Sequence, residues 1–422
     1  MTLFENRPLT YGGTSPRSNV LGDRLVRVSN TRPVVVASVA VVALAPALYL
    51  IYFMSQVKLY LDFRVYFLGA QHVLDPQLYH VGTTFDLHFP FTYPPVAAMF
   101  FWPFTAFSFR LAALVWTTVT LGALASIVRM SLRLARPDFS RRGLAVATAL
   151  SVGVVFFFEP IWENFHFGQV NLVLGALTMY DVLERPRRRL PRGVLLAVAT
   201  CVKLIPGIFI LYFLFRRQYR TALTAGLTVV ALNAIAFALN HRATWDYWTK
   251  YAFNASRMGG VLYNSNQSLR GASQRLAHHL LGQGLLTALS ALALALGLVV
   301  ALRYATKRSE LAMLVAVGVT GDLVSPISWS HHLIWFIPLT FWLTLAHDRP
   351  RGGQWWALLL AGGCFGGVIW LPPQGANQTL HWNWWENLPG NYYFLAMVLT
   401  LVALAVGGAP ARRQREAASR RS

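Results

Sequence analysis

Residues 34–54 read VVVASVAVVALAPALYLIYFM, a run of 21 residues without a charged side chain. A helix of this length crosses the roughly 30 Å of hydrocarbon in a bilayer. Five arginines precede the run, and because basic residues stay on the cytoplasmic side, we expect residues 1–33 to be a cytoplasmic segment. The run is too long for the apolar part of a cleavable signal peptide, so it predicts a retained anchor.

The composition of the whole chain indicates a polytopic membrane protein. Of 422 residues, 55% are hydrophobic and 13% are charged, and the mean hydropathy is +0.45, outside the balance of soluble domains. The formal charge of +21 falls in short clusters between apolar runs, which indicates membrane topology and argues against a nucleic-acid partner. Cys201 and Cys364 lie in apolar runs and predict neither a disulfide nor a metal site.

Apolar runs alternating with basic clusters predict about 12 crossings, with both termini cytoplasmic. Residues 34–408 form one integral membrane domain, and residues 409–422 a basic cytoplasmic tail. Pro103 and Arg110 divide residues 96–128 into a short interfacial or re-entrant piece and one crossing. The other single crossings are predicted at residues 144–158, 170–183, 221–239, 285–302, 311–327, 332–346, 355–371 and 392–408, with outer segments at 55–95, 159–169 and 240–282.

Residues 193–215 are apolar but have basic clusters on both sides. A single crossing would place one of these clusters outside. We therefore predict a hairpin of two short or tilted helices that turns near Lys203 and Pro206, with Lys203 on the outer side. A lone amine there favours an anion such as a lipid phosphate, and the alternative is a lysine that snorkels to the interface.

The outer segments carry the polar residues that are candidates for chemistry. Asp62 stands after the first span, in the run Leu61-Asp62-Phe63-Arg64-Val65-Tyr66, and a carboxylate at the edge of hydrocarbon needs a chemical role or a partner. The alternative is an interfacial acid paired with Arg64. The run Phe91-Thr92-Tyr93-Pro94-Pro95 predicts an extended chain at the membrane surface, or simply an aromatic belt.

Two later outer segments add donors and acceptors. Asn264-Ser265-Asn266-Gln267-Ser268-Leu269-Arg270-Gly271 offers amides that suit sugar hydroxyls and a guanidinium that suits phosphate. In Ser325-Pro326-Ile327-Ser328-Trp329-Ser330-His331-His332, the adjacent histidines point apart and do not make a zinc site, but either one suits a phosphate or a proton. A turn-rich loop and a packed histidine pair are the structural alternatives. Glu163, His166, Gln169 and Asn171 form a fourth outer cluster.

The motifs at residues 62–66, 91–95, 266–268 and 325–332, in this order, resemble the actinobacterial GT-C glycosyltransferases of family 87, above all the mycobacterial α-1,2-mannosyltransferases that use polyprenyl-phosphate mannose. The resemblance covers roughly residues 34–405. The chain has no glycine-rich phosphate loop, which argues against a cytoplasmic nucleotide donor. The resemblance implies an all-α GT-C fold in the plasma membrane, with an extracytoplasmic active site and with phosphatidylinositol mannoside or lipomannan/lipoarabinomannan as the acceptor.

The resemblance also implies roles for the outer residues. Asp62 matches the catalytic acid of the first outer loop and would act as general base in an inverting transfer. His331 or His332, with Lys203 and Arg270, would stabilise the leaving phosphate. The sequence leaves open which histidine acts. We expect the remaining substrate contacts from Arg64, Tyr66, Tyr93, Glu163, Gln169, Asn266, Gln267 and Trp329.

Asp62 has no second acid beside it, so we predict no metal requirement and no cofactor. A lipid-linked arabinofuranosyltransferase has the same implied architecture and is the first rival. A secondary transporter is the second, but transporters place charged groups near the midplane and often show repeated halves. The polar groups here gather on one face, and no repeat is visible.

Overall fold

The computed structural model describes residues 20–28, 31, 33, 37, 60–82, 89–183, 190–252, 254, 257, 259–276, 282–307 and 309–407. The predicted first span, 34–54, lies outside the described residues apart from residue 37, and so does the basic tail 409–422. All regular structure in the described part is helical, with two isolated bridges, Gly82–Pro90 and Asn266–Trp329. The all-α prediction is therefore confirmed there.

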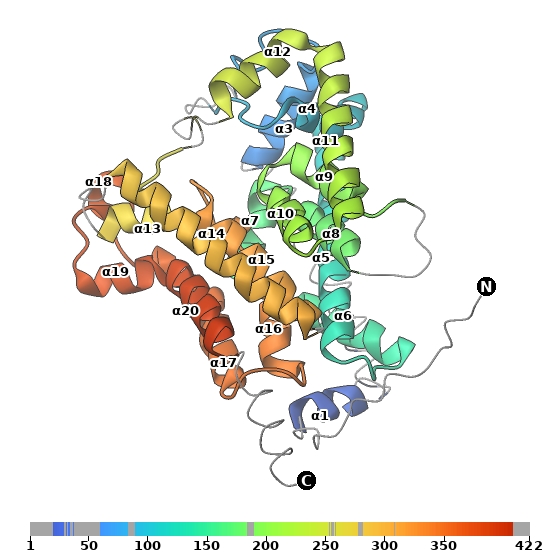
Figure 1. Cartoon of the computed structure of the whole chain (residues 1–422), viewed down its shortest axis with the longest axis vertical. Coiled ribbons are helices and arrows are strands. Elements are labelled where there is room, and N and C mark those ends of the chain that lie inside the picture. Colours follow the sequence, from blue (N-terminus) through green and yellow to red (C-terminus); the bar gives the residue numbers. More distant parts are fainter. Residues whose placement is uncertain are drawn as a thin grey trace.

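Helices of very different length follow one another along the chain (Figure 1). They are α1 (Val20–Val28), α3 (Leu61–Gln71), α4 (Pro95–Phe101), η2 (Trp102–Ala106), α5 (Phe109–Ala135), α6 (Arg141–Val155), α7 (Glu159–Phe167), α8 (Asn171–Val182), α9 (Val194–Val202), η3 (Ile205–Gly207), α10 (Ile208–Phe215), α11 (Tyr219–Leu239), α12 (His241–Asp246), η4 (Tyr247–Tyr251), α13 (Leu269–Leu276), α14 (Gln283–Thr306), α15 (Glu310–Val324), η6 (Ser330–His332), α16 (Phe336–Leu345), α17 (Gly353–Gly366), η7 (Val368–Trp370), α18 (Ala376–Thr379), α19 (Trp384–Gly390) and α20 (Tyr392–Gly407).

Three described helices, α5, α11 and α14, are long and apolar enough to cross a membrane. The pairs α6 with α7 and α19 with α20 are bent by 82° and 69°, and counting each pair as one span gives up to five. This is fewer than the predicted 12, because several predicted crossings are short helices. For example, α8 has 12 residues and α16 has 10, whereas a helix needs about 20 to cross the hydrocarbon.

The helix α15 lies at the centre of the packing. Every residue from Leu311 to Leu323 is buried, and α14, α16 and α20 pack around it (Figure 1). The helices α11 and α14 are different. In the most apolar stretch of 18 residues in each helix, only 17% and 28% are buried. Their exposed leucines and valines suit a lipid environment, since hydrocarbon replaces the protein core as their apolar surroundings.

The structure interrupts two apolar stretches where the sequence predicts it. Residues 95–106 form the short helices α4 and η2, and α5 then begins at Phe109, where the Ser108 hydroxyl caps it by accepting from the Leu111 amide. Residues 193–215 break after α9, where Lys203 is extended and Pro206 lies in η3. Proline lacks an amide donor and so favours a break at this point.

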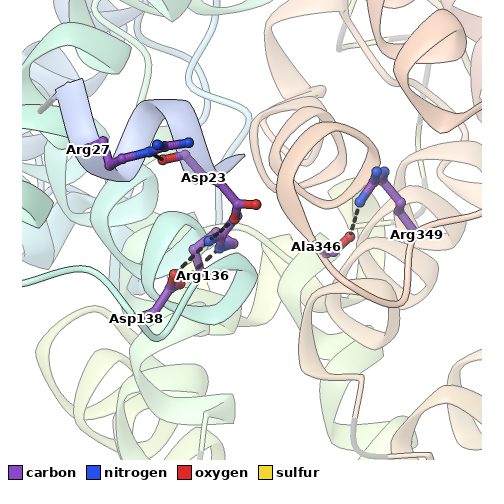
Figure 2. Close-up of polar contacts among 6 residues, drawn as sticks. All are labelled: Asp23, Arg27, Arg136, Asp138, Ala346 and Arg349. Carbon is purple, nitrogen blue, oxygen red and sulfur yellow. Dashed lines mark hydrogen bonds and ion pairs between the residues drawn. The ribbon is translucent and has the colours of Figure 1, made fainter. Parts of the chain in front are cut away.

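Figure 2 shows the polar contacts of Arg136 and Arg349, which belong to two basic clusters far apart in the sequence. Arg136, just after α5, is 2.8 Å from Asp23 of α1 and 2.6 Å from Asp138. The helix α1 also contacts α16, which is followed by Arg349, whose guanidinium donates to the Ala346 carbonyl at 3.0 Å. Two clusters predicted to face the cytoplasm therefore share one end of the molecule.

Candidate functional site

A cavity of about 970 Å³ lies at the C-terminal end of α15 and the N-terminal end of α16, whereas Arg349 follows the other end of α16. Ser325 follows α15 and His332 precedes α16, and both line the cavity. Its other walls come from α3, the chain before α4, the break after α9, and the segment between η4 and α13. The volume is at the upper end of the range for small-molecule sites.

Asp62 lines this cavity from the first turn of α3. Burial raises the pKa of Asp62 to about 6, and the nearby charge of Glu163 adds to this effect. A side-chain hydrogen bond with Gln169 and the positive charge of Lys203 act in the opposite direction. The result is a carboxylate that is ionised at neutral pH but more basic than an ordinary aspartate.

The position of Gln169 beside α3 depends on Gly168, which ends α7 with a φ of +67°. A Cβ at Gly168 would lie 2.7 Å from Cβ of Phe63 and 2.7 Å from Cε1 of Tyr60. The Trp116 indole donates to the Gly168 carbonyl at 2.9 Å. Glycine is thus required for both the left-handed backbone and the close approach to α3.

A tyrosine pair orients the Gln169 side chain. The Tyr66 hydroxyl donates to Oε1 of Gln169 at 2.9 Å and lies 3.0 Å from the Tyr93 hydroxyl. Oε1 also accepts from Nδ2 of Asn171 at 3.3 Å. Tyr93 lines the cavity, whereas Tyr66 is fully buried behind it. Because Oε1 is the acceptor in these contacts, the Gln169 amide nitrogen is left for Asp62.

Lys203 also lines the cavity, at the break between α9 and η3. Its Nζ donates to Oδ1 of Asn171 at 2.7 Å and lies 2.9 Å from Nε2 of His332. The Tyr93 ring centroid is 5.9 Å away. The ammonium is therefore held in one place by side chains from α8 and η6, close enough to Asp62 for their charges to interact.

The two histidines differ in their contacts, although both line the cavity. His332 contacts Lys203 through Nε2. Neither ring nitrogen of His331 has a hydrogen-bond partner among the described residues, and its backbone carbonyl is fixed by Nδ2 of Asn164 and Nδ2 of Asn171. The two histidines therefore differ: the ring nitrogens of His331 are buried without a partner among the described residues, and His332 is the one that positions Lys203.

The other predicted site residues divide into two groups. Arg270 and Trp329 line the cavity. Arg64 and Glu163 are not among the lining residues: the Arg64 guanidinium lies 4.4 Å from the Phe109 ring centroid, and Glu163 is 3.4 Å from His166. Glu163 still influences the site, since its charge raises the pKa of Asp62.

Asn266 and Gln267 are buried behind the cavity wall and hold chain segments together. Oδ1 of Asn266 accepts from the Ser328 amide at 2.9 Å, next to the bridge with Trp329. Gln267 donates to the Gly390 carbonyl at 2.8 Å and accepts from the Phe394 amide at 3.0 Å. Their amides thus contact backbone, and they support the wall that carries Trp329.

Comparison with known proteins identifies the family of this chain. The sequence model of glycosyltransferase family 87 matches residues 91–326. The chain belongs to glycosyltransferase family 87. Asp62 lies before the matched stretch, whereas Lys203, Arg270 and most of the cavity wall lie within it. No solved structure matches the chain.

Characterised relatives of this glycosyltransferase are similar over most of its length. It is 34% identical to a polyprenol-phosphate-mannose-dependent alpha-(1-2)-phosphatidylinositol mannoside mannosyltransferase of Mycolicibacterium smegmatis, over 81% of this chain and 82% of the relative. A Mycobacterium tuberculosis protein with the same description is also 34% identical, over 81% and 84%. A pentamannoside mannosyltransferase of M. tuberculosis is 32% identical, over 81% and 80%.

The structure adds to the glycosyltransferase's site a residue that the sequence does not single out, Arg257. It lines the cavity, with its guanidinium 4.2 Å from the Tyr251 ring centroid and donating to the Tyr79 carbonyl at 2.6 Å. Among the described lining residues, the cations are then Lys203, Arg257 and Arg270, and the one acid is Asp62. The histidines aside, the lining carries a positive excess.

Proposed function

We propose that this glycosyltransferase moves mannose from polyprenyl-phosphate mannose to a phosphatidylinositol mannoside, forming an α-(1→2) linkage with inversion. The observation that carries the proposal is that one cavity is lined both by a carboxylate of raised pKa and by a fixed lysine. These are the two groups that such a transfer needs: a base for the acceptor and a cation for the leaving phosphate. The names of the relatives favour mannose over arabinose.

The charge of the cavity supports phosphate-bearing substrates. Its described lining carries three cations and one acid, apart from the histidines. A polyprenyl-phosphate sugar and a phosphatidylinositol mannoside each carry one phosphodiester. Two anionic lipids would therefore offset the excess of two positive charges, which would otherwise be costly to hold at a membrane.

In the proposed step, an acceptor hydroxyl attacks the anomeric carbon of the β-linked donor from the face opposite the phosphate. The new bond from carbon to the acceptor oxygen forms as the bond from carbon to the phosphate oxygen breaks. Asp62 takes the hydroxyl proton, and a base with a pKa of about 6 suits this transfer near neutral pH. The products are the extended mannoside and a polyprenyl phosphate monoester.

Lys203 and the ring of His331 are the groups that we assign to the leaving phosphate. As the diester becomes a monoester, negative charge grows on its oxygens, and a cation already fixed in place stabilises that change without reorganisation. Lys203 meets this condition, because Asn171 and His332 hold its Nζ. Both ring nitrogens of His331 are buried without a partner in the described part of the chain, and we assign one of them to donate to the phosphate once the donor is bound. We assign Arg270 to stabilise the same negative charge on the leaving phosphate.

We further propose a GT-C arrangement in the plasma membrane, with about 12 crossings and the cavity on the extracytoplasmic face. The support is the direction in which α15 and α16 cross the molecule. Both helices run between the end near Arg349, which follows α16, and the end that carries the cavity. Since basic clusters stay on the cytoplasmic side, the opposite end faces outward.

The deciding experiment is a transfer assay with the purified full chain in lipid nanodiscs. We expect mannose transfer from polyprenyl-phosphate mannose to phosphatidylinositol mannoside, with an α-(1→2) linkage by NMR of the product. Polyprenyl-phosphate arabinose should compete weakly and should give no product. Arabinose transfer, or flux of sugar lipid across sealed vesicles without a new glycosidic bond, would overturn the proposal.

A further inference from the structure

Asp322 is a buried acid that the proposed reaction does not use. It lies near the end of α15, and its side chain is only 2% exposed. Its Oδ2 has no hydrogen-bond partner among the described residues. An acid in this position on an apolar helix is costly unless a cation or another polar group accompanies it.

A second, much smaller cavity connects Asp322 with Lys203. Its volume is about 30 Å³, and its polar lining consists of Asn171, Thr178, Lys203, Asp322 and His332. A water molecule needs about 10–15 Å³ of this kind of volume and two to four polar partners. The Thr178 hydroxyl, like Oδ2 of Asp322, is buried and has no hydrogen-bond partner within the described ranges. The cavity thus has both the size and the partners for one water.

Lys203 has one donor left for this cavity. An ammonium carries three N–H groups, and two of those of Lys203 are directed to Asn171 and His332. The acids whose charges act on Lys203 are Asp62, on the side of the large cavity, and Asp322, on the side of the bundle. Lys203 therefore lies between two carboxylates of different exposure.

We infer that Asp322 is the counter-ion of Lys203 on the bundle side, linked to it and to Thr178 by one bound water, and that it positions Lys203 for the donor phosphate. Asp62 cannot fill this role throughout the reaction, because it becomes neutral when it takes the acceptor proton. Asp322 is not among the residues that line the large cavity, so it takes no part in the proposed proton transfer. The inference rests on the proposed function, in which Lys203 binds the donor.

The first test is a double-mutant cycle that compares midpoints of thermal unfolding and needs no substrate. Lys203→Met leaves Asp322 without its cation, so we expect a lower midpoint of thermal unfolding. Adding Asp322→Asn should restore most of that loss, although Asp322→Asn alone lowers the midpoint. As a matched control, Asp181→Asn removes a buried acid that instead accepts from the Gly193 and Leu196 amides at 2.8 and 2.9 Å, and its effect should add to that of Lys203→Met.

The second test separates positioning from simple stability. In Asp322→Asn we expect the donor KM to rise about tenfold, with kcat within about threefold of wild type, whereas Asp181→Asn should leave the donor KM unchanged. Additive midpoints for Lys203→Met and Asp322→Asn would overturn the pairing. A coupled pair with an unchanged donor KM would overturn the positioning role. If the proposed donor is wrong, the stability cycle still reports on the pair, so the two failures are distinguishable.

Discussion

Replacing Asp62 by asparagine should remove activity and at the same time stabilise the protein. Asparagine has almost the same shape but cannot take a proton, and loss of a general base typically lowers a rate by about 10²–10⁴-fold. The effect on stability follows from the pKa. Burial raises the pKa of Asp62 from 3.8 to about 6, so the folded protein holds the ionised carboxylate at a cost.

The free-energy cost of the ionised Asp62 in the folded protein can be estimated, and so can the pH range over which it develops. One pKa unit corresponds to about 1.4 kcal/mol, so the ionised Asp62 destabilises the folded state by at most about 3 kcal/mol at pH 7. The partial opening of the side chain to the cavity makes this an upper bound. The penalty is absent below the ordinary pKa of 3.8 and is complete once the pH passes about 6. Asp62→Asn should therefore stabilise the folded protein at pH 7 and have little effect on its stability near pH 4.

The assay combines initial rates with thermal or denaturant unfolding at pH 4, 5.5 and 7. The matched control is Asp138→Asn. Its hydrogen bond with Arg136 lowers the pKa of Asp138, so its loss should lower stability at pH 7 and leave transfer intact. Substantial turnover in Asp62→Asn would exclude Asp62 as the base. A clear loss of stability at pH 7 would show that the carboxylate is instead a structural partner.

Four further outcomes are expected. In the wild type, kcat/KM should fall about tenfold per pH unit below pH 6, because protonated Asp62 no longer acts as a base; a flat profile between pH 5 and 7 would contradict this. Lys203→Met should raise the donor KM more than it lowers kcat, and an unchanged donor KM would argue against its phosphate role. Arg136→Gln leaves Asp23 and Asp138 without their shared cation and should lower the unfolding midpoint, whereas the KM for either lipid should not move. Incubation with EDTA followed by gel filtration should leave the transfer rate unchanged, and a loss restored by a divalent cation would show that a metal is needed.

Features that depend on charge along the chain were predictable. The break at Lys203 follows from basic clusters on both sides of one apolar stretch, because membrane topology cannot place both inside with a single crossing. Asp62 was identifiable because an acid beside a predicted span is expensive. The structure then places Asp62 and Lys203, 141 positions apart in the numbering, on the same cavity wall.

Features that depend on which groups meet were not predictable. The amides of Asn266 and Gln267 suit sugar hydroxyls and backbone groups equally well, and only the fold shows that they contact backbone. Arg257 has no motif around it, and its place on the cavity wall comes from the path of the segment before α13. Asp322 was not singled out from the sequence, and its relation to Lys203 requires the packing of α15 against η3.

The backbone at Gly168 makes the chemistry vulnerable from a place that no sugar needs to touch. Adding one methyl group there would push against Phe63 and Tyr60, which lie one residue after and two residues before the acid in sequence. The acid must lie within about 3 Å of the acceptor hydroxyl. Even a small shift of the first turn of α3 would therefore abolish mannose transfer, although every reactive group would still be present. Inactive natural variants are thus to be sought among residues without functional groups as well as among the charged ones.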